Sequence, residues 1–327
     1  MYDVITMGSN SVDVFVHTDQ SGIIDVRSKK GCEEFISYPV GSKMLITKLL
    51  HNFGGNGTNS AVSFSRLGLR TAYIGEVGRD ENGRLILNHL KKEKIDFLGA
   101  RGNESGFSII LDAMEEDRTI LVYKGCNNDL KFSRINKAKL KAKWLYLSSM
   151  LGESLQAMTQ IAEYAKKNKI RIAFNPSITI LENETPKAIN LLRYADVLVL
   201  NKEEAEILAG NNVPEVNIKK LSVYGPDIIA ITDGKNGAIA YKEGYYYKIT
   251  PRADLKVVET TGAGDAFAST LTAGIILNKP FEFCLKMAIN NSESVISHHG
   301  AQNMLLSRKK LFEIVNNDKR IVEKRKA

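Results

Sequence analysis

Short apolar segments alternate with helical segments along most of this chain. The apolar segments have strand length and are hydrophobic throughout, and amphipathic stretches such as ESLQAMTQIAEYAKK (153–167) lie between them. Strands that are apolar on both sides, with helices between them, indicate a parallel sheet covered on both faces. We therefore predict an α/β fold, with strands in YDVITMG (2–8), TAYIGEV (71–77), WLYLSS (144–149), RIAFN (171–175), DVLVL (196–200) and DIIAIT (227–232).

Two segments interrupt this alternation. Residues 14–50 contain short alternating runs without a clear helix, and residues 105–124 have the pattern of two strands joined by an acidic turn at Glu115–Asp117. Together they predict a small antiparallel sheet inserted beside the main one. Because the chain contains no internal repeat, low-complexity segment or proline-rich linker, we expect one domain over residues 1–327.

The composition favours a soluble cytoplasmic protein. Of its 327 residues 43% are hydrophobic, which is enough to bury a sizeable core. Cys32, Cys126 and Cys284 are odd in number and far apart, so they form neither a disulfide framework nor a metal spacing, which favours a reducing compartment. The start MYDVITMGSN has no basic stretch typical of a signal peptide. No apolar run approaches the roughly 20 residues of a membrane span, so we expect no membrane partner.

The formal net charge of +8 raises the question of nucleic acid as a partner. Much of the excess lies in residues 308–327, and a second basic run covers residues 131–143. Neither run interleaves aromatic residues as a single-strand binder would, and such runs usually form solvated helix faces. We therefore expect no nucleic-acid partner.

One short stretch, ETTGAGDAF (259–267), places Gly262, Ala263 and Gly264 directly before Asp265 and before a segment that has the pattern of a buried helix. A helix N-terminus exposes unpaired N–H groups, and glycine lets an anion approach them closely. An acid in the first turn of an ordinary helix would also be stabilised by the dipole. The stretch alone leaves both interpretations open.

A second glycine cluster, NFGGNGTNSAVSFSRLG (52–68), also precedes a predicted helix. Taken alone, it favours a tight turn capped by Asn and Thr side chains. Neither cluster has the G-x-G-x-x-G pattern of a dinucleotide-binding turn, and the chain contains no G-x-x-x-x-G-K-[ST] loop. These absences disfavour a nicotinamide-dependent oxidoreductase and exclude a P-loop NTPase.

Several motifs along the chain are similar to those of one known family. GGNGTNSAVSFSRLG (54–68) followed by GEVGRDENG (75–83) is similar to its N-terminal signature, and ETTGAGDAF is similar to its C-terminal signature. Between them lie an N-x-x-E motif in NKEEAEIL (201–208) and a nucleotide-binding turn in ITDGKNGAIAY (231–241). Through these motifs, nearly the whole chain resembles the ribokinase-like (PfkB) carbohydrate kinases.

The resemblance implies a fold and a reaction. The fold is a three-layer α/β/α ribokinase-like domain with a mainly parallel central sheet and a small β-sheet lid, here formed by about residues 14–50 and 105–124. The reaction is ATP-dependent phosphorylation of a hydroxyl of a sugar or sugar-like compound. The backbone N–H groups of Gly262, Ala263 and Gly264 would form an anion hole for the transferring phosphoryl group. Asp265 would be the general base for the substrate hydroxyl.

The resemblance also implies two groups of binding residues. The substrate would be held by Asp13, at the end of GSNSVD (8–13), and by Gly54, Gly55, Asn56 and Asn59. The nucleotide and its hydrated Mg²⁺ would be held by Asn201, Glu204, Thr232, Gly234, Lys235 and Gly237, with Glu204 acting on the metal through water.

Some alternatives stay open at this stage. Glu259 stands where many members of the family have Asp, a position linked in some to activation by a monovalent cation. Ser149, with Glu153 nearby, stands where ribokinase offers a Glu to its sugar. The alternatives to a sugar kinase are a nucleoside kinase or a sugar-phosphate kinase of the same family and, more remotely, a non-catalytic sugar-binding regulator. A homodimer through the lid is a further expectation.

Overall fold

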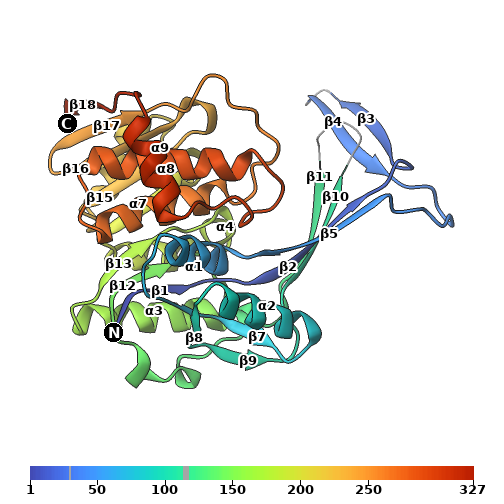
Figure 1. The fold of residues 1–327 in the computed structure, drawn as a ribbon, viewed down its shortest axis with the longest axis horizontal. Coiled ribbons are helices and arrows are strands. Elements are labelled where there is room, and N and C mark those ends of the chain that lie inside the picture. The colour runs from blue at the N-terminus through green and yellow to red at the C-terminus, as the bar shows by residue number, and fades with distance from the viewer. Residues whose placement is uncertain (29–30, 113–117) are drawn as a thin grey trace.

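The computed structural model describes residues 1–28, 31–112 and 118–327 (Figure 1). Within these residues, the main sheet contains ten strands in the order β18-β17-β16-β15-β14-β13-β12-β1-β6-β8. From β8 to β15 neighbouring strands run parallel, and from β15 to β18 they run antiparallel. The strands are β1 Tyr2–Met7, β6 Thr71–Ile74, β8 Asp96–Phe97, β12 Ala142–Leu147, β13 Arg171–Phe174, β14 Val197–Asn201, β15 Ile228–Thr232, β16 Ala238–Lys242, β17 Tyr245–Ile249 and β18 Glu323–Lys326.

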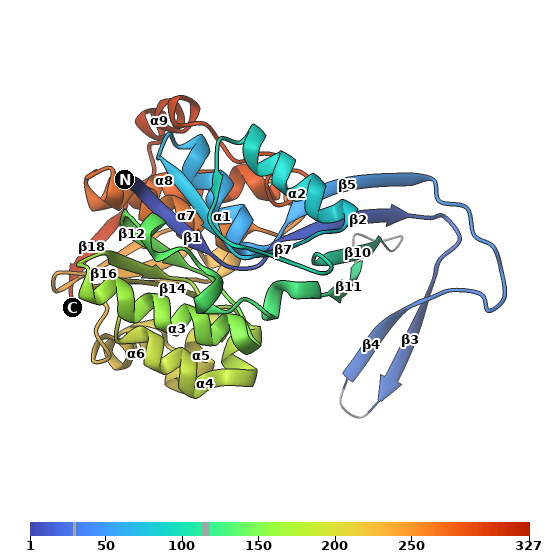
Figure 2. The same ribbon diagram turned by 90° about the horizontal axis from the view of Figure 1, so that it is seen from below.

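Helices cover both faces of this sheet (Figure 2). One apolar cluster joins one face to α3 Gly152–Lys167, α4 Ile178–Leu192, α5 Lys202–Ala209 and α6 Pro214–Ser222. Two further clusters join the other face to α1 Asn56–Arg66, α2 Glu81–Lys92, α7 Ala263–Ile276, α8 Phe281–Ile296 and α9 Arg308–Asn317. Short 3₁₀ turns are η1 Gly125–Asn128, η2 Phe132–Arg134, η3 Lys137–Lys139 and η4 Gly234–Asn236. This arrangement confirms the predicted three-layer α/β/α fold with a mainly parallel central sheet.

A second sheet extends from the core as a lid (Figure 1). Its order is β11-β10-β2-β5, and its strands are β2 Ser11–His17, β5 Lys48–Gly54, β10 Phe107–Asp112 and β11 Arg118–Tyr123. The sequence predicted an antiparallel sheet here, and that detail is wrong because β10 pairs with β2 in parallel. Both strands leave the core in the same direction, and β5 and β11 return to it as their antiparallel partners. The predicted acidic turn at Glu115–Asp117 lies outside the described residues.

Beyond the lid, the strands β3 Gly22–Ser28 and β4 Gly31–Ser37 pair as an antiparallel hairpin. It projects past the end of the lid and away from the core in both views (Figures 1 and 2). A further small parallel pair consists of β7 Glu76–Gly78 and β9 Ala100–Gly102. In the chain, β7 follows β6 of the main sheet, and β9 precedes lid strand β10. The hairpin and the lid therefore account for the two segments that interrupt the strand–helix alternation.

The basic end of the chain differs from the solvated helix face that its charge run suggested. Only its first part is helical, in α9, where Leu311 and Val315 are buried. Its last part, EKRK, is an edge strand that pairs with β17. Lys324 lies over the ring of Tyr245, 4.4 Å from its centroid, so long cationic side chains cover the aromatic surface of the neighbouring strand.

No helix in the described part of the chain has the length and the apolar character that a membrane crossing would need.

Candidate active site

The predicted site residues gather where the parallel strands of the main sheet end and the lid begins. Asn201 ends β14 and lies opposite Thr232, which ends β15. Asp13 lies on β2 of the lid, opposite Asn52 of β5. In open α/β sheets, ligands bind at the carboxyl ends of the strands, so the position alone favours a binding site.

The turn before α7 has two glycines with different surroundings. Gly262 is the N-cap residue, with a left-handed φ of 81°, and a Cβ there would lie 2.4 Å from the Cβ of Ala301. Among the described residues, no heavy atom lies within 4 Å of a Cβ built on Gly264. The fold therefore requires glycine at 262, whereas at 264 the missing side chain leaves open space in front of the helix N-terminus.

Ala263 begins α7, and its N–H donates to the carbonyl oxygen of Thr260 at 3.2 Å. The predicted anion hole therefore has one of its three donors engaged in closing the turn in this structure. Gly264, the next residue, is exposed.

Asp265 follows this turn and faces α1. Its Oδ2 accepts a hydrogen bond from Nδ2 of Asn59 at 2.8 Å. Burial raises the pKa of Asp265 to about 6, although the hydrogen bond from Asn59 acts in the opposite direction. A carboxylate with a pKa close to neutrality can accept a proton in one step and release it in the next, as a general base must.

Asn201 and Glu204 form a capping box at the start of α5. The Asn201 side chain accepts from the N–H of Glu204, and a carboxylate oxygen of Glu204 accepts from the N–H of Asn201, both at 2.8 Å. The motif thus caps a helix. Burial raises the pKa of Glu204 to about 7; the Asn201 hydrogen bond opposes this shift, and the nearby charge of Asp265 adds to it.

The carboxylate of Glu204 fits a hydrated Mg²⁺ better than a metal ion held only by protein side chains. Among the described residues, no group of three or more His, Cys, Asp or Glu side chains could hold a metal ion. Mg²⁺ is commonly bound by one or two carboxylates together with substrate phosphates, and it keeps several waters. Glu204 supplies one such carboxylate, close enough to Asp265 for the two charges to interact.

A cavity of about 180 Å³ lies between the core and the lid. Asp13 lines it, and burial raises the pKa of this carboxyl above its ordinary range, although hydrogen bonds from Ser11 and Ser108 oppose the shift. Gly54 makes room for Asp13, because a Cβ on Gly54 would lie 1.9 Å from Asp13 Oδ2. Other residues of the lining are Ser9, Asn10, Gly55, Lys124, Asn127 and Thr261.

Two predicted substrate residues lie beside this cavity with their amides already engaged. The Oδ1 atom of Asn56 accepts from the N–H and the hydroxyl of Ser9, both at 3.0 Å. Oδ1 of Asn59 accepts from Gln302 at 2.8 Å, while its NH₂ group donates to Asp265. Both asparagines lie within α1, which begins at Asn56, so Gly57 is inside the helix rather than before it as the sequence suggested. There Gly57 packs against the backbone of Gly8.

A second cavity, of about 580 Å³, lies on the other side of the α7 turn. Part of its lining is hydrophobic. The predicted nucleotide residues in the lining are Thr232, Gly234, Lys235 and Gly237, and the residues of the turn are Thr260, Ala263 and Gly264. Because Thr260 lines this cavity and Thr261 lines the lid cavity, consecutive residues of one turn face both spaces.

A larger open cavity, of about 780 Å³, lies elsewhere, near Asp227 and Ile228 where β15 begins. Lys242 and Lys279 are also part of its lining. It therefore lies at the amino ends of the strands and contains none of the predicted site residues.

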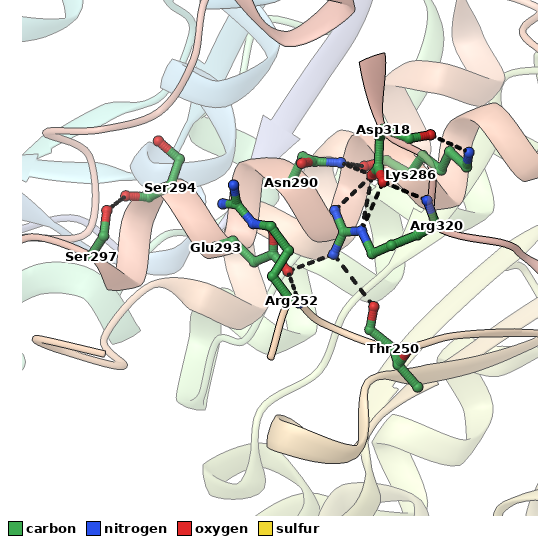
Figure 3. Close-up of polar contacts among 9 residues, drawn as sticks. All are labelled: Thr250, Arg252, Lys286, Asn290, Glu293, Ser294, Ser297, Asp318 and Arg320. Carbon is green, nitrogen blue, oxygen red and sulfur yellow. Dashed lines mark hydrogen bonds and ion pairs between the residues drawn. The ribbon is translucent and has the colours of Figure 1, made fainter. Parts of the chain in front are cut away.

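The sequence did not single out the wall of the nucleotide-side cavity. Glu293 on α8 is 2% exposed and accepts from the N–H of Arg252 at 2.8 Å and from its Nε at 2.9 Å. Arg320 from the C-terminal segment donates to the same carboxylate at 2.6 Å (Figure 3). Burial alone would raise the pKa of Asp318, but hydrogen bonds from Arg320 and Asn290 outweigh it and lower that pKa to about 2.

This network braces the loop after β17, because Glu293 binds both the main-chain N–H and the side chain of Arg252. Both residues line the cavity. Its partners lie 41 and 27 residues apart, and no local motif marks them. Arg320 of the C-terminal segment thus holds Glu293, which lines the cavity, through a hydrogen bond (Figure 3).

The chain is similar to known proteins over most of its length. Residues 4–308 match the model of the pfkB family carbohydrate kinase. The chain is 28% identical over 327 residues to a ribokinase of Bacillus subtilis, covering 97% of this chain and 100% of the relative. It is 25% identical over 307 residues to a 5-dehydro-2-deoxygluconokinase of Halalkalibacterium halodurans, covering 86% and 90%.

Among solved structures, the fold is similar to that of a candidate ribokinase II from E. coli in complex with ATP and Mg²⁺. The TM-score is 0.83 at 17% identity, and the match covers 97% of this chain and 100% of that chain. At this identity the likeness concerns the fold.

Proposed function

Because the chain belongs to the pfkB family of carbohydrate kinases, enzymes that transfer a phosphoryl group to an alcohol, we propose that it transfers the γ-phosphoryl group of ATP to a hydroxyl of a sugar or sugar-like compound. One observation carries the proposal: the turn at 260–264, followed directly by Asp265, faces the lid cavity on one side and the larger cavity on the other. A phosphoryl group must pass between two such spaces. The proposal treats residues 1–327 as one kinase domain.

Asp265 is the general base in this proposal. It removes the proton of the attacking hydroxyl; the hydroxyl oxygen then forms a bond to the γ-phosphorus as the bond from that phosphorus to the bridging oxygen of ADP breaks. Charge on the transferring group is stabilised by backbone N–H groups of Gly262, Ala263 and Gly264 at the positive end of α7. The open space at Gly264 supports this assignment, because it lets an anion reach the helix N-terminus.

The larger cavity takes the nucleotide. Thr232, Gly234, Lys235 and Gly237 line it and would contact the phosphates and ribose. Asn201 and Glu204 lie beside the phosphate end and would hold the hydrated Mg²⁺, which when bound neutralises charge on the phosphates. Activation by a monovalent cation near Glu259 is left as an alternative.

The lid cavity takes the substrate. The carboxylate of Asp13 would accept from substrate hydroxyls in the cavity that Gly55 also lines. Gly54, which makes room for Asp13, and Asn56 and Asn59 of α1 would complete the substrate contacts. The names of the relatives make a ribose-type sugar and 5-dehydro-2-deoxygluconate the first acceptors to test. Lys124 in the lining keeps a sugar phosphate as an alternative, and a nucleoside is another.

A homodimer through the lid is part of the proposal, with cytoplasmic localisation. Large apolar side chains are exposed on β11 and on the hairpin beyond the lid, among them Ile120, Leu121, Val122, Ile24 and Phe35. Such patches on a soluble protein commonly mark contact surfaces. Light scattering during gel filtration would distinguish a dimer from a monomer.

The substrate proposal is tested by an ADP-release screen with ATP and Mg²⁺. The panel contains free pentoses and hexoses, keto-deoxy sugar acids, nucleosides and sugar phosphates. Turnover with a sugar or sugar acid is expected. Turnover with nucleosides alone would replace the sugar assignment, and no turnover combined with tight sugar binding by calorimetry would favour a regulator.

A further inference from the structure

A run of side-chain hydrogen bonds connects a histidine on α2 to the proposed base. Nε2 of His89 lies 2.7 Å from Oε1 of Gln302. Nε2 of Gln302 donates to Oδ1 of Asn59 at 2.8 Å, and Nδ2 of Asn59 donates to Oδ2 of Asp265 at 2.8 Å. The four residues come from α2, the segment before α9, α1 and α7, so the run joins parts of the chain that are far apart in sequence.

The donors and acceptors in this run permit only one orientation of the Asn59 and Gln302 amide groups. An ionised carboxylate can only accept, so the NH₂ group of Asn59 must face Asp265 and its oxygen must face Gln302. Gln302 therefore donates through its NH₂ group to Asn59 and presents its oxygen to His89. This assigns the proton of His89 to Nε2.

Gln302 is held rigidly in the middle of the run. Its side chain belongs to a residue that is only 4% exposed, and Asn59 is 5% exposed. The carbonyl oxygen of Gln302 accepts from Nη1 of Arg66 at 2.7 Å, and Arg66 is itself paired with Glu93. At the far end, the ring of His89 stacks on Phe53 of lid strand β5, with the centroids 4.1 Å apart.

We propose that Gln302 is a positioning residue, which keeps the NH₂ group of Asn59 on Oδ2 of Asp265 and so directs the substrate proton to the other carboxylate oxygen, Oδ1. This inference rests on the proposed role of Asp265 as the base. In the transfer, the O–H bond of the substrate breaks and the proton binds Oδ1. The freed oxygen forms its bond to the γ-phosphorus as the bond from that phosphorus to the bridging oxygen breaks and ADP leaves. Without Gln302 only the Asp265 carboxylate orients the amide of Asn59, so the hydrogen bond to Oδ2 is held less firmly.

Other titratable groups also face the two ends of the run. The charge of Asp265 acts on Tyr146 on β12 and on Glu204 on α5, raising the pKa of each. His89 is surrounded by Glu93, Arg66 and Lys92, and burial lowers its pKa, so the ring is neutral at pH 7. These groups are unchanged in the variants below, so a shift at Asp265 reports on the orientation of Asn59.

The test replaces Gln302→Met, which keeps the length and the apolar bulk and removes both hydrogen-bonding groups. The titration of the Asp265 carboxyl is followed by carbon-13 NMR on protein labelled at the aspartate carboxyl carbons, with its resonance assigned by comparison with Asp265→Asn. We expect the midpoint to rise by about half a pH unit or more, since a donor to the charged form is weakened. The acid limb of kcat/KM should move by the same amount, and the KM for ATP should stay within about twofold.

Gln302→Leu is the second variant, in case the first does not fold. It also removes the donor to Asn59 and adds no charge, so it should raise the same midpoint. Asn303→Ser is the matched control, because Asn303 lies in the same turn but donates to Asn52 and to the carbonyl of His299. A Gln302 variant with a lower melting temperature and an unchanged Asp265 midpoint would overturn the inference. The proposed function fails separately, if Asp265→Asn remains active.

Discussion

The two glycine-rich turns that frame the site use the same residue type for different physical reasons. Around the start of α1, an added Cβ would collide at each of three glycines: with Asp13 at Gly54, with Asn10 at Gly55 and with Gly8 at Gly57. In the turn before α7, the collision occurs at Gly262, whereas Gly264 faces open space in the described part of the structure. Glycine in the first turn therefore serves packing, and glycine in the second serves both packing and ligand approach.

Two further glycines line the nucleotide-side cavity. Gly237 has a φ of 89°, and its Cβ would lie 2.0 Å from the carbonyl oxygen of Ile249. Gly234 has open space around it, but its left-handed φ of 47° favours glycine whatever the space. Both glycines therefore serve the backbone, whereas Gly264, which has no left-handed φ, points to ligand approach.

The largest expected effect separates the two glycines of the α7 turn. Gly262→Ala should lower the free energy of unfolding by about 2–4 kcal/mol, because a left-handed φ and a collision with Ala301 act together. Gly264→Ala should fold with unchanged or slightly higher stability, since alanine favours a helix, yet lose roughly 10- to 100-fold in kcat because the methyl group holds the phosphoryl group off the backbone donors. Urea unfolding and steady-state kinetics measure both. Equal losses of stability in the two variants would contradict the comparison.

A smaller effect is expected in the turn before α1. Gly54→Ala should push aside the carboxylate of Asp13 and raise the KM for the sugar about tenfold, which corresponds to the loss of one hydrogen bond to a charged group. The KM for ATP should be unchanged, because the nucleotide-side cavity does not include Asp13. An equal rise in both KM values would show that the substitution disturbs the whole site.

The smallest effect concerns stability and pH. Since the pKa of Asp265 is raised from 3.8 to about 6 in the folded state, the folded protein holds a proton that the unfolded chain has released in this interval. Stability therefore falls as the pH rises through this window and stays lower above it. Asp265→Asn removes the penalty and should melt a few degrees above the unmodified protein at pH 8, with little difference near pH 4. A variant that is less stable at pH 8 would show that the carboxylate stabilises the fold.

Much of the fold followed from the sequence because the central strands are apolar throughout. Segments such as DVLVL and DIIAIT have few alternatives to a buried parallel strand. The edge strand β18 could not be predicted in this way, because it is made of charged residues and is held by pairing with β17. The parallel pairing of β10 with β2 likewise depends on where the chain leaves the core.

The candidate site divides in a similar manner. Residues such as Gly262 and Asp265 could be predicted because each lies in a short motif beside a predicted strand or helix end. Gln302 and Glu293 could not, since their polar partners lie 243 and 41 residues away and nothing in the local sequence identifies them. Conversely, Asn201 and Glu204 carry a motif whose visible effect is to cap a helix.

The central claim is that Asp265 accepts the proton of the substrate hydroxyl while the α7 turn holds the phosphoryl group. The most direct test compares kcat of Asp265→Asn with that of the unmodified protein, using the acceptor found in the screen, and measures ATP binding by calorimetry on the same samples. We expect kcat to fall by about 10²–10⁴, the usual contribution of a general base, with ATP affinity within about twofold. Turnover at close to the unmodified rate, with ATP bound equally well, would contradict the account.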